Sequence, residues 1–399
     1  MSYTSPTTSV RLGLQSQHPA SPLLQRLTGT LTSCPWLQLV PVETQETQET
    51  QETQETQEPD LFFLVGDPAY VHAILSKRTS PARVWVYLLQ SQETLETRHV
   101  EVLNAKADRI FATSREWRGL QRRQGLTKPV DVLPPIPLLP SGTIPREKGR
   151  IHLRIPDDTT ILLSMNRNAA HKRYDILIQA FVELLLKHPQ KPLFLMCVCD
   201  KGPNQEHALA ETTEQIQQTV GYHPLFDLFS RELKQKGASV ADYSSRLMLS
   251  TQYDSLSDED ASLFYSIADV GVSCADGGAT DLCVLDGMAH GLPHVVSHIV
   301  AHQGLCTADN SIRVEPVARI QCGSQERQLV SASAVAQALE TYVTNDTLRK
   351  AHGSVAAATV AAVTTISSIA GIATTHPPTN SLLKRLDLFR QERDIDLAP

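Results

Sequence analysis

Short apolar runs rich in β-branched and aromatic residues alternate along this chain with runs whose apolar residues recur at helical spacing. Residues 84–89, 160–165 and 193–198 are strand-like, whereas residues 174–187 place their apolar side chains at helical intervals. Strands that alternate with helices across short connections pair in parallel, and helices then cover both faces of the sheet. The alternation therefore predicts an α/β fold built on mostly parallel sheets.

The length of the chain and one proline-rich segment predict two domains. The chain has 399 residues, whereas one domain usually has about 100–200 residues. Residues 134–145 contain five prolines, which interrupt the alternation. We therefore predict a first domain over residues 1–133, a linker over 134–150 and a second domain over 151–352. Residues 353–399 form a tail with no clear period before a terminal helix.

A low-complexity segment interrupts the first domain. Residues 43–58 consist of five ETQ triplets and a final glutamate. Because this segment is polar and acidic and has no apolar face, it cannot bury surface to offset the entropy of ordering. We predict a disordered surface loop here. A regulatory or partner-binding segment is the alternative.

Composition narrows the class of protein. A formal net charge of −7 and a pI near 6.1 argue against a partner nucleic acid. No apolar run reaches the ~18–20 residues of a membrane span, and the N-terminus does not resemble a secretory signal. Seven scattered cysteines predict free thiols in a reducing compartment, and hence a cytoplasmic protein. Cys197 and Cys199 share one face of a strand, but no second pair stands at zinc spacing, so no metal site is expected.

Basic residues gather in the loop between a predicted strand and a predicted helix. Arg167, His171, Lys172 and Arg173 lie within residues 166–173. Positive side chains next to the free N–H groups of a helix start can bind phosphate. An arginine fork and a lysine point charge together suit a diphosphate. A solvated basic loop paired with nearby acids is the alternative interpretation.

A second segment, residues 274–296, predicts the edge of a binding site. A strand-like run precedes it, a glycine-bearing turn follows at residues 276–278, and a helical run then carries Asp286. Ligands of α/β sheets lie outside the carboxyl ends of the strands, where helix N-termini present N–H groups. His290 and His294 flank the end of this helix, and we expect them to act as helix-end residues that favour the helix dipole.

These two segments resemble the retaining GT-B-fold glycosyltransferases of the glycogen-synthase-like group, the glycosyltransferase family 4 type. Arg167 and Lys172, five positions apart and followed by residues 175–181, resemble the family's strand–loop–helix. Residues 286–293, DGMAHGLP, resemble the second half of its acidic motif. The spelling around Arg167 is similar to a viral and protist branch of the group. The resemblance extends over residues 10–336 and is weakest at its start.

This resemblance implies a GT-B architecture, with two Rossmann-like parallel-sheet domains that face each other across a cleft. It implies that the second domain binds a nucleotide-diphosphate sugar. Arg167 and Lys172 would bind the diphosphate, Asp286 would hold the ribose, and the N–H groups of Leu282 and Cys283 would assist the phosphate. No metal and no further cofactor are implied, because the cations and the helix dipole neutralise the leaving group.

The chain departs from the family pattern at the acid that faces the transferred sugar. Gly278 stands at the position of that first glutamate, and Asp286 shortens the second acid by one methylene. Asp281 introduces an acid near the phosphate, which repels a diphosphate unless the side chain caps the following helix. The catalytic residue is therefore unidentified. Asp276, and His18 as a substitute for a histidine that the family often carries, are the weak candidates.

The resemblance implies transfer of a sugar from a nucleotide-diphosphate donor, with retention of configuration, to a glycan, protein or small-molecule acceptor. The alternative is a catalytically impaired nucleotide-binding or structural protein of the same fold, which Gly278 favours. A nicotinamide-dependent dehydrogenase is a third candidate. The segment after the first predicted strand, residues 13–19, has no glycine-rich phosphate loop, which argues against it.

Overall fold

The computed structural model divides into two compact units. One contains the chain up to Ile136 and the last turns of α13 (Asp346–Ile369), and the other contains Pro137–Ala362. His18, the repeat at 43–58 and the predicted terminal helix lie outside the described residues. The structure describes residues 10–17, 22–32, 37–40, 59–80, 82–90, 93–140, 145–199, 225–250, 253, 256–322 and 325–369.

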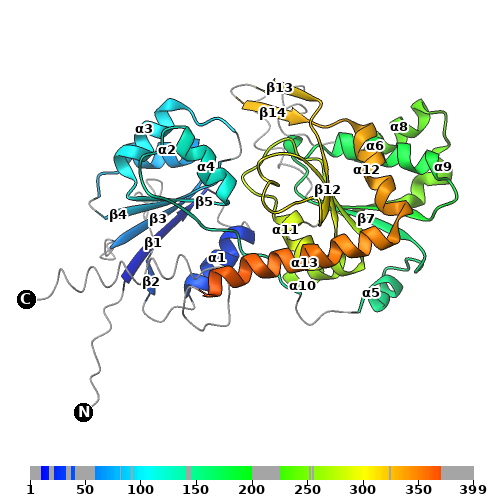
Figure 1. Ribbon diagram of the computed structural model, residues 1–399, viewed down its shortest axis with the longest axis horizontal. Helices are drawn as coiled ribbons and strands as arrows, with labels where there is room; N and C mark the ends of the chain where they lie inside the picture. Colours follow the sequence, from blue (N-terminus) through cyan, green and yellow to red (C-terminus); the bar gives the residue numbers. More distant parts are fainter. Residues whose placement is uncertain are drawn as a thin grey trace, which may run out of the picture. The chain divides into compact units, whose positions relative to one another are not determined.

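The first unit is built on a six-stranded parallel sheet of order β2-β1-β3-β4-β5-β6 (Figure 1). Its strands are β1 (Val10–Ser16), β2 (Leu37–Val40), β3 (Leu61–Gly66), β4 (Arg83–Leu88), β5 (Arg109–Ala112) and β6 (Val130–Val132). Its helices are α1 (Pro22–Thr32), α2 (Pro68–Lys77), α3 (Thr97–Lys106) and α4 (Arg115–Arg123). In Figure 1, α2, α3 and α4 lie on one face of this sheet and α1 on the other.

Local sequence explains where these helices start. Asp67 accepts a hydrogen bond from the Tyr70 backbone N–H, and Pro68 occupies the first turn of α2, where its missing N–H costs nothing. Ser114 caps α4 in the same way, by accepting from the Trp117 N–H. Every residue of β3 is buried, as expected for a strand covered on both faces.

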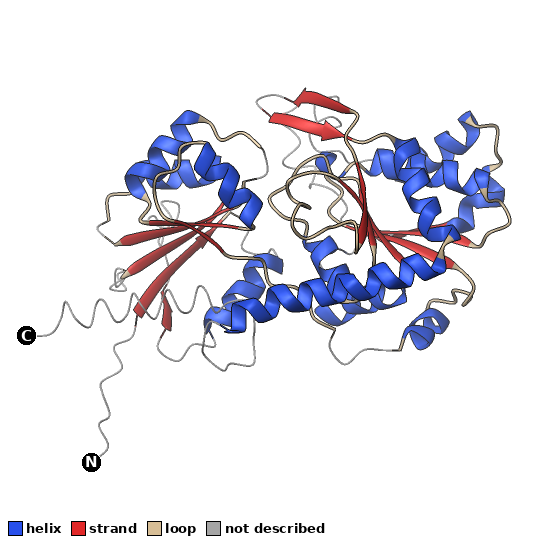
Figure 2. Cartoon of the chain, in the orientation of Figure 1, coloured by secondary structure: helices blue, strands red, loops and turns tan. Residues whose placement is uncertain are grey.

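The second unit also contains a six-stranded parallel sheet, of order β12-β11-β10-β7-β8-β9. Figure 2 draws strands in red and helices in blue. The strands of this sheet are β7 (Thr160–Met165), β8 (Leu193–Val198), β9 (Leu247–Ser250), β10 (Val270–Ser273), β11 (His294–Ser297) and β12 (Ser311–Val314). An antiparallel hairpin, β13 (Ala318–Cys322) and β14 (Gln325–Leu329), follows β12. The helical segments are α5 (Arg146–His152), η2 (Ala170–Lys172), α6 (Tyr174–Lys187), α8 (Leu225–Gln235), α9 (Val240–Tyr243), η4 (Ser244–Arg246), α10 (Asp258–Ile267), α11 (Leu282–Ala289), α12 (Ala332–Thr344) and α13.

Alternate side chains of β7 pack into two hydrophobic cores, one on each face of the second sheet. Leu162 packs with side chains of α6, α8 and α12. Ile161 and Leu163 pack instead with side chains that include Tyr265 of α10 and Cys283 of α11. The period of two along a strand thus divides the apolar run between the two helical layers. The two sheets confirm the predicted α/β fold with parallel sheets.

The structure differs from the sequence prediction in the last third of the chain. Asn345 separates α12 from α13. The Asn345 side chain accepts a hydrogen bond from the Leu348 N–H, which starts α13 as a new helix. Residues 353–369, which show no clear period in the sequence, continue α13. No helix within the described residues is both long and apolar enough to cross a membrane.

Candidate functional site

Two loops meet where the strand order of the second sheet reverses. From β7 the chain proceeds to β8 and β9 on one side, while β10, β11 and β12 occupy the other. Ligands of open α/β sheets bind outside the carboxyl ends of the strands at such a reversal. Residues 166–173 follow β7 here, and residues 274–281 follow β10. The Asp276 N–H donates to the His171 carbonyl at 2.9 Å, so the two predicted segments are in contact.

The basic loop contains one exposed arginine, Arg167, and one arginine, Arg173, that is held in ion pairs within the fold. Arg167 is exposed, and none of the hydrogen bonds or ion pairs found among the described residues engages its side chain. Arg173 adopts a left-handed conformation, with φ 51° and ψ 48°, between η2 and α6. Its guanidinium donates to both oxygens of Asp175, at 2.9 and 2.6 Å. Arg173 therefore fixes the start of α6, while Arg167 remains available to a ligand.

His171 reveals a third cation at this site. The pKa of His171 is lowered to about 3, first by desolvation and then by the charges of Lys172, Arg167 and Arg327. The imidazole is therefore neutral at pH 7 and has three cations near it. Arg327 comes from β14, in a segment where the sequence predicted no strand. No local pattern distinguishes it from any other surface arginine.

Lys172 forms an ion pair with an acid, as the alternative interpretation of this loop expects. Its ammonium lies 3.5 Å from Oδ1 of Asp281, and the two side chains are 11% and 3% exposed. Asp281 precedes α11 but makes no side-chain hydrogen bond to the helix N-terminus. The condition under which Asp281 would not repel a phosphate, capping of this helix by its side chain, is therefore not met. Its charge is balanced by side chains instead.

Asp276 is buried and lies between two arginines. Its Oδ2 is 3.7 Å from Arg173 and 3.8 Å from Arg327. Its backbone carbonyl accepts from the Gln328 N–H at 3.2 Å. Its Oδ1 is buried and has no hydrogen-bond partner. These contacts attach hairpin β13–β14 to the loop that follows β10, so Asp276 has a structural task whether or not it takes part in chemistry.

The first turn of α11 has backbone N–H groups without an intrahelical acceptor, and it lies at the strand-order reversal of the second sheet. The first intrahelical bond runs from the Leu285 N–H to the Asp281 carbonyl at 3.1 Å. The N–H groups of Leu282 and Cys283 precede it and have no acceptor within the helix. The thiol of Cys283 is buried, and burial raises its pKa to about 12. Only the backbone of this residue therefore suits a phosphate.

Asp286 lies farther along α11, and its side chain is buried. One of its oxygens, Oδ1, accepts a hydrogen bond from the Leu138 N–H at 2.7 Å. This bond ties α11 to the segment that follows β6. If Asp286 also holds a ribose, as predicted, its carboxylate must do so while it accepts the hydrogen bond from Leu138.

Gly278 has a backbone conformation that side chains rarely adopt. Its φ is +146°, and the nearest atom to an added Cβ would be the Thr280 carbonyl oxygen at 4.0 Å. Space for a side chain therefore exists at the position of the missing glutamate. The backbone, not crowding, opposes a larger residue here.

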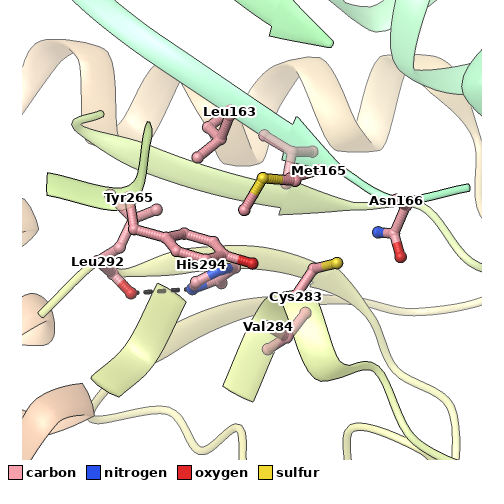
Figure 3. Close-up of a pocket in the computed structure, with 9 residues that line it drawn as sticks. Leu163, Met165, Asn166, Tyr265, Cys283, Val284, Leu292 and His294 are labelled. Atoms are coloured by element: carbon pink, nitrogen blue, oxygen red, sulfur yellow. Dashed lines mark hydrogen bonds between the residues drawn. The ribbon is translucent and has the colours of Figure 1, made fainter. Parts of the chain in front are cut away.

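The two histidines near the end of α11 differ from each other. His290 contacts the Asp286 carbonyl at 2.8 Å through Nδ1, as expected at a helix end. His294 does not act on the helix dipole. It is buried between Gly271 and Gly287, and burial lowers its pKa to about 4, so the ring is neutral. The small cavity that it lines with Tyr265, about 10 Å³, is nearer to the size of one water than of a substrate (Figure 3).

The described residues offer no group of three histidine, cysteine, aspartate or glutamate side chains that could hold a metal ion. The sequence matches no protein-family model. It also matches no curated protein.

Solved structures are similar to the whole fold at low sequence identity. Sucrose-phosphate synthase from Thermosynechococcus elongatus is 14% identical with a TM-score of 0.64, and the match covers 97% of this chain and 100% of that one. A glycosyltransferase from Rickettsia africae is 14% identical with a TM-score of 0.62, over 96% and 98% of the two chains. Anabaena HepE, solved with UDP and glucose, is 12% identical with a TM-score of 0.61, over 89% and 95%. These likenesses show the GT-B fold, with its two Rossmann-like domains.

Proposed function

We propose that this chain is a glycosyltransferase that binds a nucleotide-diphosphate sugar on its second unit. The observation that carries the proposal is that Arg167, Lys172 and the first turn of α11 come from segments that meet at the strand-order reversal. The arginine offers a planar fork, the lysine a point charge and the helix its free N–H groups. Together they match the charge and the oxygen atoms of a diphosphate.

These groups also suit the chemistry of transfer. When the bond between the sugar's anomeric carbon and the donor oxygen breaks, negative charge develops on the diphosphate. Fixed cations and backbone N–H groups stabilise that charge without a metal ion. The sugar passes to a hydroxyl of a glycan, protein or small-molecule acceptor. Retention of configuration rests on the resemblance of residues 167–181 and 286–293 to retaining enzymes.

The nucleotide is proposed from chemistry and from one structural neighbour. HepE, which has the same fold, was solved with UDP and glucose. We infer a uridine or guanosine diphosphate leaving group here, with Asp286 as the group that meets the ribose hydroxyls. The free buried thiols fit a reducing compartment, and we propose the cytoplasm. They are Cys197, Cys199, Cys274, Cys283 and Cys306.

A specific observation supports a second candidate, a nucleotide-binding protein of this fold with impaired transfer. Gly278 has no side chain to face the sugar, and Asp276 is held by two arginines instead of being free to approach it. In this alternative the diphosphate still binds, because Arg167 and Lys172 are present. Binding and turnover must therefore be tested separately.

Binding is tested by thermal unfolding with UDP and with GDP. A nucleotide that binds the folded state raises the melting temperature, by an amount that grows with its concentration. We expect the shift in the wild type and its loss in the double variant Arg167→Ala/Lys172→Ala. Lys234→Ala, an exposed lysine on α8, is the matched control and should keep the shift. Absence of a shift with both nucleotides would refute the two nucleotide-binding proposals.

Turnover is tested by release of UDP or GDP from a panel of nucleotide sugars. The wild type is expected to release diphosphate slowly by hydrolysis and faster with a suitable acceptor. Arg167→Ala/Lys172→Ala should abolish both. A protein that binds nucleotide but releases none from any donor would favour the impaired alternative.

A further inference from the structure

Asp281 is shared between the proposed diphosphate site and a buried histidine that has no role above. Oδ2 of Asp281 accepts from the Ser273 hydroxyl at 2.6 Å and lies 3.3 Å from Nε2 of His302. Oδ1 lies 3.5 Å from the Lys172 ammonium. Burial alone would raise the pKa of this carboxyl, but Lys172, His302 and Ser273 together hold the pKa well below its usual range. Asp281 is therefore an ionised carboxylate between two basic side chains.

His302 has an acceptor at each ring nitrogen. Its Nδ1 lies 2.7 Å from the Ser297 carbonyl oxygen, and its Nε2 faces the Asp281 carboxylate. The side chain is 1% exposed, so water does not replace either contact. A neutral imidazole has one N–H and one unprotonated nitrogen. The lone pair of that nitrogen would face a lone pair of the oxygen next to it. Because Asp281 is ionised, only a ring that carries protons on both nitrogens satisfies both contacts.

We propose that His302 is a positioning residue for the donor diphosphate: as an imidazolium it neutralises Asp281 and leaves the Lys172 ammonium free to bind phosphate. This inference rests on the proposed function. If His302 were neutral, Lys172 alone would balance the buried carboxylate, and the site would lose the effect of one of its cations. An acid at position 281 would repel a bound phosphate. The charge of His302 offsets that repulsion because it neutralises the Asp281 carboxylate.

The other groups around His302 leave Asp281 as its counter-ion. His294, on the neighbouring strand β11, is neutral because burial lowers its pKa to about 4. Cys306 donates its backbone N–H to the His302 carbonyl, and burial raises the pKa of its thiol to about 12. Lys172 lies on the far side of the carboxylate. Of these groups, Asp281 alone carries negative charge.

A double-mutant cycle on UDP affinity tests the coupling. His302→Gln keeps a donor for Asp281 but removes the charge, and we expect the dissociation constant of UDP to rise roughly tenfold. In the Asp281→Asn background the same change should have no effect, because no carboxylate remains to be neutralised. A purely structural role of His302 predicts the same loss in both backgrounds.

The outcomes separate this inference from the proposed function. A wild type that binds neither UDP nor GDP refutes the proposed function and this inference together. A wild type that binds, with His302→Gln equally costly in both backgrounds or harmless in both, refutes this inference alone.

The charge of His302 is also measurable without nucleotide, which keeps the inference testable if a variant does not fold. The ¹⁵N NMR shifts of the imidazole distinguish the doubly protonated ring from either neutral tautomer. We expect the doubly protonated pattern at pH 7 in the wild type and a neutral ring in Asp281→Asn. The signal is assigned by its absence from His302→Gln or His302→Asn. A neutral ring in the wild type would overturn the inference.

Discussion

Asp276 is a buried acid whose ionisation opposes folding. Burial raises its pKa to about 6, although Arg327 and Arg173 lower it in part. Its Oδ1 has no hydrogen-bond partner to compensate for lost hydration. An acid with a raised pKa in the folded state keeps its proton while the same acid in the unfolded chain loses it. The protein therefore loses stability as pH rises through this interval.

Because the raised pKa of Asp276 makes the wild type less stable at higher pH, the difference in the free energy of unfolding between the wild type and Asp276→Asn should depend on pH. In the unfolded chain the carboxyl ionises near its ordinary pKa of 3.8, and in the folded protein near 6. The wild type should lose roughly 1–3 kcal/mol relative to Asp276→Asn as pH rises from 4 to 7.5, with most of the change complete by about pH 6. Urea unfolding of both proteins at the two pH values measures the difference. A gap that is equal at both pH values would contradict the assigned cause.

Gly278 combines open space with an unfavourable backbone. We expect Gly278→Ala and Gly278→Glu each to lower the free energy of unfolding by about 1–2 kcal/mol, because both must adopt a φ of +146°. Urea unfolding checks this cost. The alanine variant carries the strain without the carboxylate, so a donor-hydrolysis assay on the pair isolates the effect of the acid. A glutamate variant much less stable than the alanine variant would show that the space is not open.

Hairpin β13–β14 is the element through which the structure adds most to the predicted site. It brings Arg327 close enough to His171 for its charge to act on the imidazole, and it is attached through Asp276. Arg327→Ala is expected to weaken UDP binding by about 5–10-fold, since it removes one of three cations near the proposed diphosphate site. Arg319→Ala, an exposed arginine on β13, is the matched control and should leave the affinity unchanged. Titration calorimetry compares the two, and equal losses would indicate a general charge effect.

Elements with a strong internal pattern were predictable from the sequence, and elements formed by distant contacts were not. The run 193–198 coincides with β8, and the run 174–187 coincides with α6. Hairpin β13–β14 was missed because its strands are short and polar, so their alternation does not differ from that of a loop. Asp281 and His302 are 21 positions apart in the sequence, with α11 and β11 between them, and no local sequence pattern predicts their contact.

At the scale of the molecule, sheet topology explains why two separate motifs form one site. The strand order reverses between β7 and β10, so the loops after these two strands share one sheet edge although about a hundred residues separate them. The alternation of strands and helices was enough to predict parallel α/β sheets, whereas two Rossmann-like domains were expected only from the family resemblance. Charge balance within the site was not predictable, because it depends on which side chains that edge brings within a few ångströms of each other.

The location of the donor site predicts where nucleotide should protect the backbone from hydrogen exchange. If the diphosphate occupies the strand-order reversal of the second unit, UDP should slow exchange in residues 166–173 and in the first turn of α11, because bound N–H groups open less often. Exchange in strands β3 and β4 of the first unit should be unchanged by nucleotide. Hydrogen-exchange mass spectrometry on the full chain, with Arg167→Ala/Lys172→Ala as the control that should lose the protection, measures both. Protection confined to the first unit would place the nucleotide on the other sheet and refute the assignment of Arg167 and Lys172.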